Sequence, residues 1–329
     1  MNFRPLAGLA FFLLIAAPAL AVDLDRPDVA AFIKQMTKDH DYDREDLRDI
    51  LGQAQIKRSI IDLISKPAEK TLSWAEYRRI FMTRERIKAG ARFWEQNRAE
   101  LESVSEDTGV PVEIIVGIIG VETYFGRITG GHRVLDALAT LAFSYPPRSA
   151  FFRRELEQFL LLVREEDMQA TDAFGSYAGA MGRPQFMPSS YRAYAVDSTG
   201  DGKRDIWNDW TDVAGSIANY FLEHGWRPGE EVVAQATISH GWQGPYPKNT
   251  LKPEETVASL SQKGVMFSTD LPADSASQLL TLEGRHGNEH WVGFNNFFVI
   301  TRYNRSVMYA LAVHQLGQEI ALEVNPDES

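Results

Sequence analysis

Residues 111–126 read PVEIIVGIIGVETYFG, and this stretch decides the fold because it is apolar on every face of a helix. Such a helix is buried on all sides, so it is expected to form the centre of the molecule. Pro111 marks its start, where proline costs little because the first amide has no helical partner. Gly126 is the predicted C-terminal cap. The remaining elements are expected to pack around this helix.

Glu122 interrupts the apolar pattern of this helix. Ile115, Ile118 and Ile119 precede it at helical steps, so Glu122 lies where another aliphatic residue is expected. Burial disfavours the charged carboxylate and raises its pKa, and a position near the helix C-terminus acts in the same direction. A carboxyl group that is still protonated near neutral pH can serve as a general acid. From the residues alone, a structural glutamate paired with an arginine is an equal alternative. The candidate partners are Arg127, Arg148 and Arg183.

Helical patterns flank the central segment on both sides. An amphipathic spacing joins Val29, Phe32, Ile33 and Met36. Ser73 and Glu76 form a capping box that starts a long helical pattern running to Val104. Further helices are predicted at Asp43–Ala54, Ile56–Ser65, Ser149–Val163 and Asp212–His224, and Ser306 is expected to cap a last helix at Val307–Leu322.

The character of the chain changes after Trp226. Short strand-like pieces lie at Val232–Ile238, Gln278–Leu282 and Trp291–Thr301, separated by turns rich in Gly, Pro and Ser. The fold class is therefore predicted as α+β, mainly α, with a small β subdomain at residues 226–302. Residues 22–75 form a predicted N-terminal helical region, residues 76–225 a helical core, and residues 303–329 a C-terminal helix that packs back on the helical part.

The first 21 residues have the three parts of a signal peptide. Arg4 precedes the apolar run Leu9–Ala17, and cleavage is expected after Ala21. The alternative, a membrane anchor, needs a longer apolar run of about 20 residues. The chain has no cysteine, so it has no site for a lipid anchor or a disulfide. A soluble, exported protein located in the periplasm is therefore predicted, with no membrane anchor.

The net charge argues against one class of partner. The whole chain carries −11, and loss of Arg4 with the signal peptide makes the mature chain −12. Nucleic acid is therefore excluded as an expected partner, because its binding needs a basic surface.

A second motif reads SYAGAMGRPQFMPSSY at residues 176–191. Its small residues allow close backbone approach, and Met181 and Met187 supply adaptable apolar contacts. Ser176, Gln185 and the serines at 189 and 190 add neutral hydrogen-bonding groups. This combination suits a sugar, although a tight turn between helices would explain the same residues.

Four segments in order carry a resemblance to a known family. They are GVETYFG (120–126), GAMGRPQFMPSSY (179–191), the acidic loop at 197–209 and RYN (302–304). Together they resemble the lytic murein transglycosylase B family, glycoside hydrolase family 103, over residues 30 to 322. The resemblance implies a lysozyme-like helical core with flanking helices. Because the lipid-bearing cysteine is missing, the chain is similar to the soluble members.

The resemblance also implies a reaction and its residues. The family cleaves the β-1,4 bond between N-acetylmuramic acid (MurNAc) and N-acetylglucosamine (GlcNAc) in peptidoglycan, and it leaves a 1,6-anhydro end. Glu122 is the implied single acid/base, whereas most glycosidases use two carboxyl groups. Asp136, Glu155 and Asp172 are the other acids considered, and each is expected to be a cap or part of a solvated helix face. The implied substrate-binding residues are Ser176, Gln185, Tyr220, Tyr77, Tyr303, Asn304, Tyr309 and Arg148, the last as a contact for a peptide or lactyl carboxylate.

The acidic loop is similar to the start of an EF-hand. Asp197, Thr199, Asp201, Lys203 (through its carbonyl) and Asp205 fall at ligand positions, and Gly202 falls at the sharp turn. Asn208 stands where the closing glutamate belongs, so Asp209 or Asp212 is the expected last ligand. A structural Ca²⁺ is predicted here, and a surface turn without metal is the alternative. The reaction itself is expected to need no cofactor.

Two other functions remain open from the sequence. One is a muramidase that uses water and releases reducing ends. The other is a non-catalytic, calcium-stabilised protein that binds peptidoglycan. Peptidoglycan strands are the expected partner in each case, and cell-wall synthesis proteins are candidate partners.

Overall fold

The computed structural model describes residues 20–66, 72–239, 242, 246 and 248–326. The predicted signal peptide lies outside these ranges except for Leu20 and Ala21, which form β1 (Leu20–Ala21) and pair with β2 (Gln55–Ile56). Among the helices of the described ranges, none has the length and apolar character needed to span a bilayer.

The described part of the chain is mainly helical. The helices are α1 (Pro27–His40), α2 (Arg44–Gly52), α3 (Arg58–Ile64), α4 (Trp74–Phe81), α5 (Arg84–Gln96), α6 (Arg98–Thr108), α7 (Val112–Thr123), α8 (Val134–Ser144), α9 (Ser149–Glu165), α10 (Pro188–Tyr194), α11 (Trp210–Glu223), α12 (Val257–Gln262), α13 (Asn295–Tyr303) and α14 (Val307–Val324), with a 3₁₀ turn, η2, at Pro146–Arg148. The strands after β2 are β3 (His132–Arg133), β4 (Phe174–Gly175), β5 (Val233–Ile238), β6 (Glu255–Thr256), β7 (Val265–Met266), β8 (Ala276–Gly284) and β9 (Gly287–Gly293). Helices α1, α2, α3, α9, α11 and α14 confirm the helical patterns expected at those positions.

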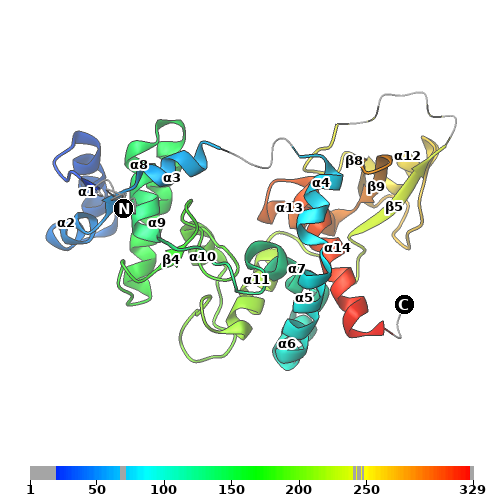
Figure 1. Ribbon diagram of the computed structural model, residues 1–329, viewed down its shortest axis with the longest axis horizontal. Coiled ribbons are helices and arrows are strands. Elements are labelled where there is room, and N and C mark those ends of the chain that lie inside the picture. The colour runs from blue at the N-terminus through cyan, green and yellow to red at the C-terminus, as the bar shows by residue number, and fades with distance from the viewer. Residues whose placement is uncertain (1–19, 67–71, 240–241, 243–245, 247, 327–329) are drawn as a thin grey trace, which may run out of the picture.

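The molecule is elongated, and distant parts of the chain meet along it (Figure 1). Helices α1 to α3 lie with α8 and α9 at one end, and α10 and α11 occupy the middle. Helices α4 to α7 lie with α13, α14 and the main sheet at the other end. The chain therefore runs from one end to the other after α3, returns after α7, and comes back through α10 and α11.

Helix α7 is buried, as its composition predicts, and it lies among the helices of the half of the molecule that carries the main sheet (Figure 1). From Ile114 to Gly120 every residue is buried. Helix α14 packs directly on α7, and glycine at two positions makes this contact close. A Cβ atom at Gly117 would lie 2.4 Å from the carbonyl oxygen of Val313, and one at Gly317 would lie 2.1 Å from that of Glu113. The two helix backbones therefore touch, which no side chain larger than hydrogen permits.

The long helical pattern at 73–104 is not one helix but three. The capping box of Ser73 and Glu76 is present at the start of α4. The helix ends at Phe81, and the hydroxyl of Thr83 accepts from the amide of Arg86 to begin α5. Asn97 separates α5 from α6. A threonine cap inside an otherwise helical pattern is the local signal for the first break.

The five-stranded antiparallel sheet has the order β6-β8-β9-β5-β7. The strand predicted at Trp291–Thr301 is wrong in its second half, because β9 ends at Gly293 and α13 begins at Asn295. A short apolar run does not distinguish a buried strand from a buried helix. The side chain of Asn296 is buried and donates to the carbonyl oxygens of Arg227 and Glu230, which anchors the first turn of α13.

Candidate active site

Glu122 lies in the last turn of α7, and its carboxyl group meets a tyrosine from the far end of the chain. The hydroxyl of Tyr309, in the first turn of α14, donates to Oε1 of Glu122 at 2.6 Å. Ile115, Ile118 and Ile119 are fully buried, whereas Glu122 is half-buried. The carboxyl group thus continues the apolar stripe but lies at its edge, where the core meets the surface.

Helix α7 does not end at the predicted cap, Gly126. Tyr124 and Phe125 already have left-handed backbone conformations, with φ of 50° and 58°. The amide of Tyr124 donates to the carbonyl of Ile119 and closes the helix. Non-glycine residues rarely adopt this conformation, and such strain collects at functional sites. The helix therefore stops one residue after Glu122, which places the carboxyl group at a turn.

Two residues missed by the sequence analysis hold this helix end. The buried hydroxyl of Thr123 donates to the carbonyl oxygen of Arg183, in the second motif, and accepts from the amide of Gly126. The guanidinium of Arg86 donates to the carbonyl oxygen of Gly120 and lies over the ring of Tyr124 at 4.7 Å. A cation here offsets the negative end of the helix dipole, the effect that the sequence predicts to disfavour a charged Glu122. A threonine directly after a glutamate in an apolar helix was the available signal for Thr123.

Tyr309 is close enough to Tyr303 for the two to interact electrostatically, and Tyr303 belongs to a cluster of aromatic residues. The ring of Tyr303 lies 4.9 Å from that of Tyr220 and 5.8 Å from that of Phe186. The Tyr303 hydroxyl donates to the carbonyl oxygen of Pro184 at 2.6 Å, and the Tyr220 hydroxyl donates to that of Arg302 at 2.7 Å. These bonds tie the segment before α14 to the second motif and to α11. The structure thus brings together four residues of the predicted site, namely Glu122, Tyr220, Tyr303 and Tyr309.

The hydroxyl groups of the cluster stay protonated. Burial, and then the negative charge of Glu122, raise the pKa of both Tyr303 and Tyr309 well above the usual value near 10. Burial also raises the pKa of Tyr220 to about 12. Tyr309 is therefore a neutral hydrogen-bond donor toward Glu122 throughout the physiological pH range.

The second motif is a tight loop whose polar groups are partly used to shape it. The hydroxyl of Ser176 accepts from the amides of Ala178 and Ala180. Gln185 has a φ of 55°, and its side-chain amide donates to the carbonyl oxygens of Thr129 and Gly182. Both residues are half-buried. Because Gln185 is strained and anchored, its remaining oxygen has a defined position.

The other predicted binding residues differ in their surroundings. Tyr77, on α4, is buried, with its ring 5.2 Å from that of Phe81, and it adds slightly to the raised pKa of Tyr309. Asn304 follows the end of α13 beside Tyr303. Arg148 is exposed in η2, and its guanidinium lies 4.5 Å from the ring centre of Phe151. Arg148 therefore belongs to the α8–α9 end of the molecule.

Asp136, Glu155 and Asp172 were each expected to be a cap or part of a solvated helix face, and two of the three are buried. Asp136 is fully buried and pairs with Lys57 and Arg133. Glu155 is buried and accepts from the amide and hydroxyl of Ser189 in the first turn of α10, so it caps that helix from a neighbouring one. Asp172 is exposed, as predicted. Both buried acids are satisfied by structural partners.

Two of the three candidate arginine partners of Glu122 have evident structural contacts. Arg183 lies 3.8 Å above the ring of Trp210 and donates to the carbonyl oxygen of Asn208. Arg127 lies over the ring of Tyr124 at 5.0 Å. Arg148, the third candidate, lies in η2 between α8 and α9.

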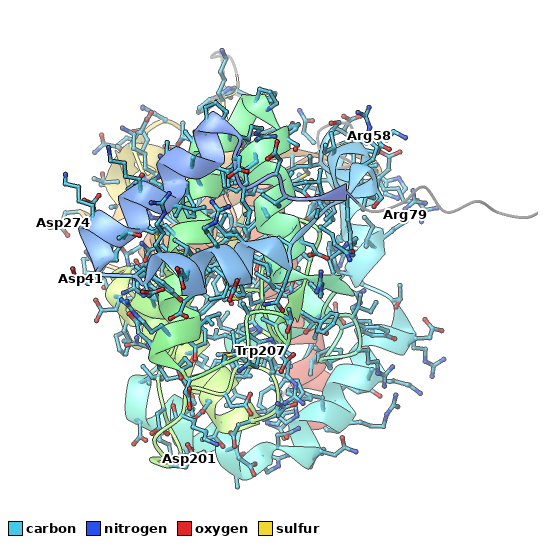
Figure 2. The ribbon with its side chains drawn as sticks, turned by 90° about the vertical axis from the view of Figure 1, so that its left-hand side faces the viewer. Asp41, Arg58, Arg79, Asp201, Trp207 and Asp274 are labelled. Atoms are coloured by element: carbon cyan, nitrogen blue, oxygen red, sulfur yellow. The ribbon has the colours of Figure 1, made fainter. Side chains whose placement is uncertain are left out.

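The acidic loop is organised around Asp197 and Asp212. Asp197 accepts from the amides of Gly200, Asp201 and Gly202 and from the Thr199 hydroxyl, which together lower the pKa of its carboxyl group. Asp212 is buried and accepts from the amides of Ser198, Thr199 and Asp205, so it closes the loop from α11. Asp209 caps α11 instead. Figure 2 shows Asp201 at the outer tip of the loop and Trp207 nearer the body.

The loop carries the oxygen donors of a calcium site in a partly open arrangement. Lys203 is exposed, and its amide donates to Asp201. Across the described residues, no three His, Cys, Asp or Glu side chains converge closely enough to hold a metal ion. The chemistry of the donors fits Ca²⁺, which prefers carboxylate and carbonyl oxygens, although Asp201 and Asp205 accept from backbone amides of the loop.

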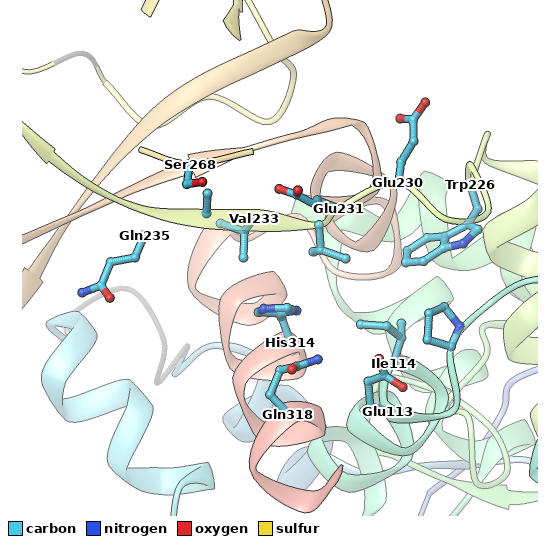
Figure 3. Close-up of a pocket in the computed structure, with 13 residues that line it drawn as sticks. Glu113, Ile114, Trp226, Glu230, Glu231, Val233, Gln235, Ser268, His314 and Gln318 are labelled. Carbon is cyan, nitrogen blue, oxygen red and sulfur yellow. The ribbon is translucent and has the colours of Figure 1, made fainter. Parts of the chain in front are cut away.

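A separate pocket of about 460 Å³ lies at the opposite end of α7 from Glu122. Figure 3 shows His314 and Gln318 of α14 facing Val233 of β5, with Glu113 of α7 beside them. Nδ1 of His314 is buried without a hydrogen-bond partner among the described residues, and burial lowers the pKa of His314 to about 4. Because Glu113 and Glu122 lie at opposite ends of one helix, this pocket is distinct from the candidate active site.

A carboxyl group at the end of a buried helix, hydrogen-bonded to a tyrosine beside a strained loop, fits the lysozyme-like helical core that the sequence predicts. Residues 25–318 match the transglycosylase SLT domain. The membrane-bound lytic murein transglycosylase B of Escherichia coli strain K12 is 43% identical over 307 residues, which cover 91% of this chain and 84% of the relative. The chain therefore belongs to the transglycosylase SLT domain family.

Solved structures show the same relationship. The lytic transglycosylase SltB1 of Pseudomonas aeruginosa is 48% identical, with a TM-score of 0.87 over 91% of this chain and 98% of that one. The Escherichia coli lytic transglycosylase Slt35 in complex with calcium is 42% identical, with a TM-score of 0.84 over 93% and 96%. Pseudomonas aeruginosa SltB3 in complex with NAG-NAM-pentapeptide is 28% identical, with a TM-score of 0.78 over 89% and 78%. These likenesses confirm the predicted fold class and family.

Proposed function

We propose that this lytic transglycosylase cleaves the β-1,4 bond between MurNAc and GlcNAc in peptidoglycan, with Glu122 as its single acid/base. The observation that carries the proposal is the 2.6 Å hydrogen bond from Tyr309 to Glu122 at the strained end of α7. The relatives support the substrate, since one is a murein transglycosylase and another is seen with NAG-NAM-pentapeptide.

The reaction uses Glu122 twice and needs no water. The protonated carboxyl group first gives its proton to the glycosidic oxygen, and the bond from C1 to that oxygen breaks. The C6 hydroxyl of the same MurNAc then attacks C1, and the Glu122 carboxylate accepts the hydroxyl proton. The products are a GlcNAc end and a 1,6-anhydro-MurNAc end, and Glu122 is again protonated.

The neighbours of Glu122 orient its carboxyl group between these two steps. The Tyr309 hydroxyl is a donor that never becomes charged, so it fixes one carboxyl oxygen in both protonation states. Thr123 and Arg86 hold the helix end on which Glu122 stands. Ser176, Gln185, Tyr220, Tyr303, Asn304 and Tyr77 are proposed to bind the sugar rings, because tyrosine offers both an apolar face and a hydroxyl group.

The decisive experiment is mass spectrometry of the products released from purified peptidoglycan. The wild type is expected to give products lighter by one water than reducing muropeptides, and Glu122→Gln none. Glu155→Gln is a matched control, because Glu155 is a buried glutamate that caps α10 and is not proposed to react. Reducing ends from the wild type would show a hydrolase that uses water. Failure of the wild type to cut would favour a non-catalytic binding protein, and full activity of Glu122→Gln would exclude Glu122 as the acid.

We also propose that the loop at 197–212 binds Ca²⁺ as a structural ion. Asp197, Thr199, Asp201, Asp205, Asp212 and the carbonyl of Lys203 would hold it, and it would compensate the charge of the four carboxylates among these ligands. Support comes from the backbone amides gathered on Asp197 and from the calcium complex of Slt35. We expect CaCl₂, but not MgCl₂, to raise the melting temperature of the wild type. The variant Asp201→Asn should not show this rise. Equal melting temperatures with CaCl₂ and with EGTA would refute calcium binding.

The cellular location is a proposal of the same kind. The signal peptide expected at residues 1–21 would export the chain to the periplasm, where peptidoglycan lies. N-terminal sequencing of the protein purified from a periplasmic fraction tests this, with Val22 as the expected first residue.

A further inference from the structure

The pocket between α7, α14 and β5 is lined by acids (Figure 3). Glu113, Glu230 and Glu231 contribute three carboxyl groups, and none of the described residues that line the pocket is a lysine or an arginine. Arg227, which is not a lining residue, pairs with Glu230 at 3.5 Å. Glu113 and Glu231 form no ion pair within the described part of the chain. The pocket therefore presents negative charge that no neighbouring cation compensates.

Two polar groups in the wall lack the partners that their burial calls for. Burial raises the pKa of the Glu113 carboxyl group, and hydrogen bonds from its own amide and from Gln318 only partly oppose this. Nδ1 of His314 is buried without a hydrogen-bond partner in the described ranges. Burial lowers the pKa of His314 to about 4, so at pH 7 the neutral imidazole has one nitrogen that can accept a hydrogen bond. A positively charged hydrogen-bond donor would satisfy both groups.

The rest of the wall is apolar and selects the other part of a ligand. Ile114, Trp226 and Val233 line it beside the acids. The indole nitrogen of Trp226 donates to the carbonyl oxygen of Gly109, which fixes this wall. An apolar surface with a few polar groups is typical of a small-molecule site, and about 460 Å³ is enough for a small ligand. No three acidic or histidine side chains converge on a metal position anywhere in the described residues, so an organic cation is the better match.

The two helices that line the pocket also carry the candidate active site. Their contact begins beside the pocket, where a Cβ atom at Gly317 would lie 2.1 Å from the carbonyl oxygen of Glu113. It ends at the hydrogen bond from Tyr309 to Glu122. Because the two backbones touch between these points, a shift of one helix at the pocket moves it at Glu122 as well. A ligand that binds Glu113 on α7 and His314 on α14 at once therefore holds the pair in one arrangement.

We propose that this pocket is an effector site for a small organic cation, a primary ammonium group on a short apolar chain. The ammonium group has three donors, so it binds the carboxylate of Glu113 and the imidazole of His314 together, and the chain lies against the apolar wall. The bound cation bridges α7 and α14, keeps Tyr309 on Glu122 and raises kcat. The effector role rests on the proposed function, whereas binding of the cation does not.

Isothermal titration calorimetry at pH 7 with hexylamine tests the binding, because this amine is protonated at pH 7. We expect a Kd of about 1 mM for the wild type. Hexanol and hexanoate have the same chain without the positive charge, and they should bind about 10-fold more weakly or not at all. Glu113→Gln keeps the size of the side chain and should weaken hexylamine binding about 10-fold or more. His314→Leu, a second variant, removes the acceptor and should weaken it too.

Glu45→Gln is the matched control, since Glu45 is an exposed glutamate on α2 at the far end of the molecule (Figure 1). It should bind hexylamine as the wild type does. Equal affinities of the wild type, Glu113→Gln and His314→Leu for hexylamine would refute the site. Equal affinities of the wild type for hexylamine and hexanol would refute it as well, because the carboxyl groups would then play no part.

Release of anhydro products with and without saturating hexylamine tests the effector role. We expect kcat of the wild type and of Glu45→Gln to rise about 5-fold, and the ratio of rates with and without the amine to stay near one for Glu113→Gln. Binding without a rise in kcat would refute the effector role. If the wild type releases no anhydro products with or without the amine, the proposed function fails, and the calorimetry still decides whether the cation binds.

Discussion

Replacing Gly117 by alanine tests the claim that α7 and α14 are held at backbone contact. The new methyl group would lie 2.4 Å from the carbonyl oxygen of Val313, a backbone atom that cannot turn away. Oversized residues in a packed core cost about 1–3 kcal/mol. Alanine regains up to about 1 kcal/mol because it favours the helix more than glycine does. The expected net loss in the free energy of unfolding is about 1–2 kcal/mol.

The same substitution should also reduce activity. The helices must move apart to admit the methyl group, and Tyr309 and Glu122 stand on the two helices that separate. Their 2.6 Å hydrogen bond would lengthen. We expect a drop in melting temperature of roughly 2–6 °C and a fall in kcat of about 10-fold or more.

Thermal unfolding followed by circular dichroism, with product release measured on the same preparation, checks both effects. Gly52→Ala is the control, since Gly52 ends α2 and the nearest atom to its new methyl group would be 3.8 Å away. That variant should be as stable as the wild type or slightly more stable. A Gly117→Ala protein with unchanged melting temperature and unchanged kcat would show that the helix contact is looser than described.

Three further predictions follow from contacts of single side chains. Tyr309→Phe should lower kcat about 10–100-fold, because Glu122 loses the hydrogen bond that orients it. The control Tyr42→Phe loses a buried hydrogen bond to the Leu160 carbonyl, so it should lower stability and leave kcat unchanged. Equal kcat values for the two variants would contradict the role of Tyr309. Burial lowers the pKa of His314 to about 4, so its stabilising contribution is present above its unfolded pKa near 6.5 and is lost as the pH falls toward 4. Urea titrations at pH 7 and pH 4 measure this loss as a fall in the free energy of unfolding. Between the two pH values His314→Leu should lose about 3 kcal/mol less than the wild type, and equal losses would refute the lowered pKa of His314. Asp212→Asn should destabilise the protein by about 1–3 kcal/mol in EGTA. The side-chain nitrogen of the new asparagine would face a backbone N–H group that the carboxylate of Asp212 accepts from in the wild type. An unchanged midpoint of urea unfolding would contradict this prediction.

The sequence predicts the central helix from its apolar residues. It also identifies Glu122 as a candidate functional residue, because a carboxyl group is unusual on a helix that has no exposed face. It does not predict where that helix stops. Gly126 has the residue type of a cap, yet Tyr124 takes the left-handed conformation, and only tertiary contacts such as that of Arg86 with its ring favour this choice. The stop decides the direction of the Glu122 side chain.

The sequence also does not predict contacts between segments that are far apart along the chain. Tyr309 was expected at the site only through a family resemblance, since nothing in the local pattern relates it to a residue 187 positions earlier. Glu155 is a similar case. The sequence indicates a cap or a solvated helix face, but it does not show which helix is capped, because the first amides that Glu155 accepts from belong to the neighbouring helix α10, through Ser189.

The placement of Tyr309 on the last helix has a consequence for biosynthesis. A ribosome makes Glu122 long before it makes α14, and the helix that packs against α7 is the final one of the described chain. Contacts between segments so far apart in sequence form late, because the intervening chain must first be ordered. The nascent protein therefore carries Glu122 without Tyr309, its hydrogen-bond partner, until synthesis is almost complete. Under the proposed function, completion of the chain acts as a safeguard, since an unfinished copy lacks the assembled site.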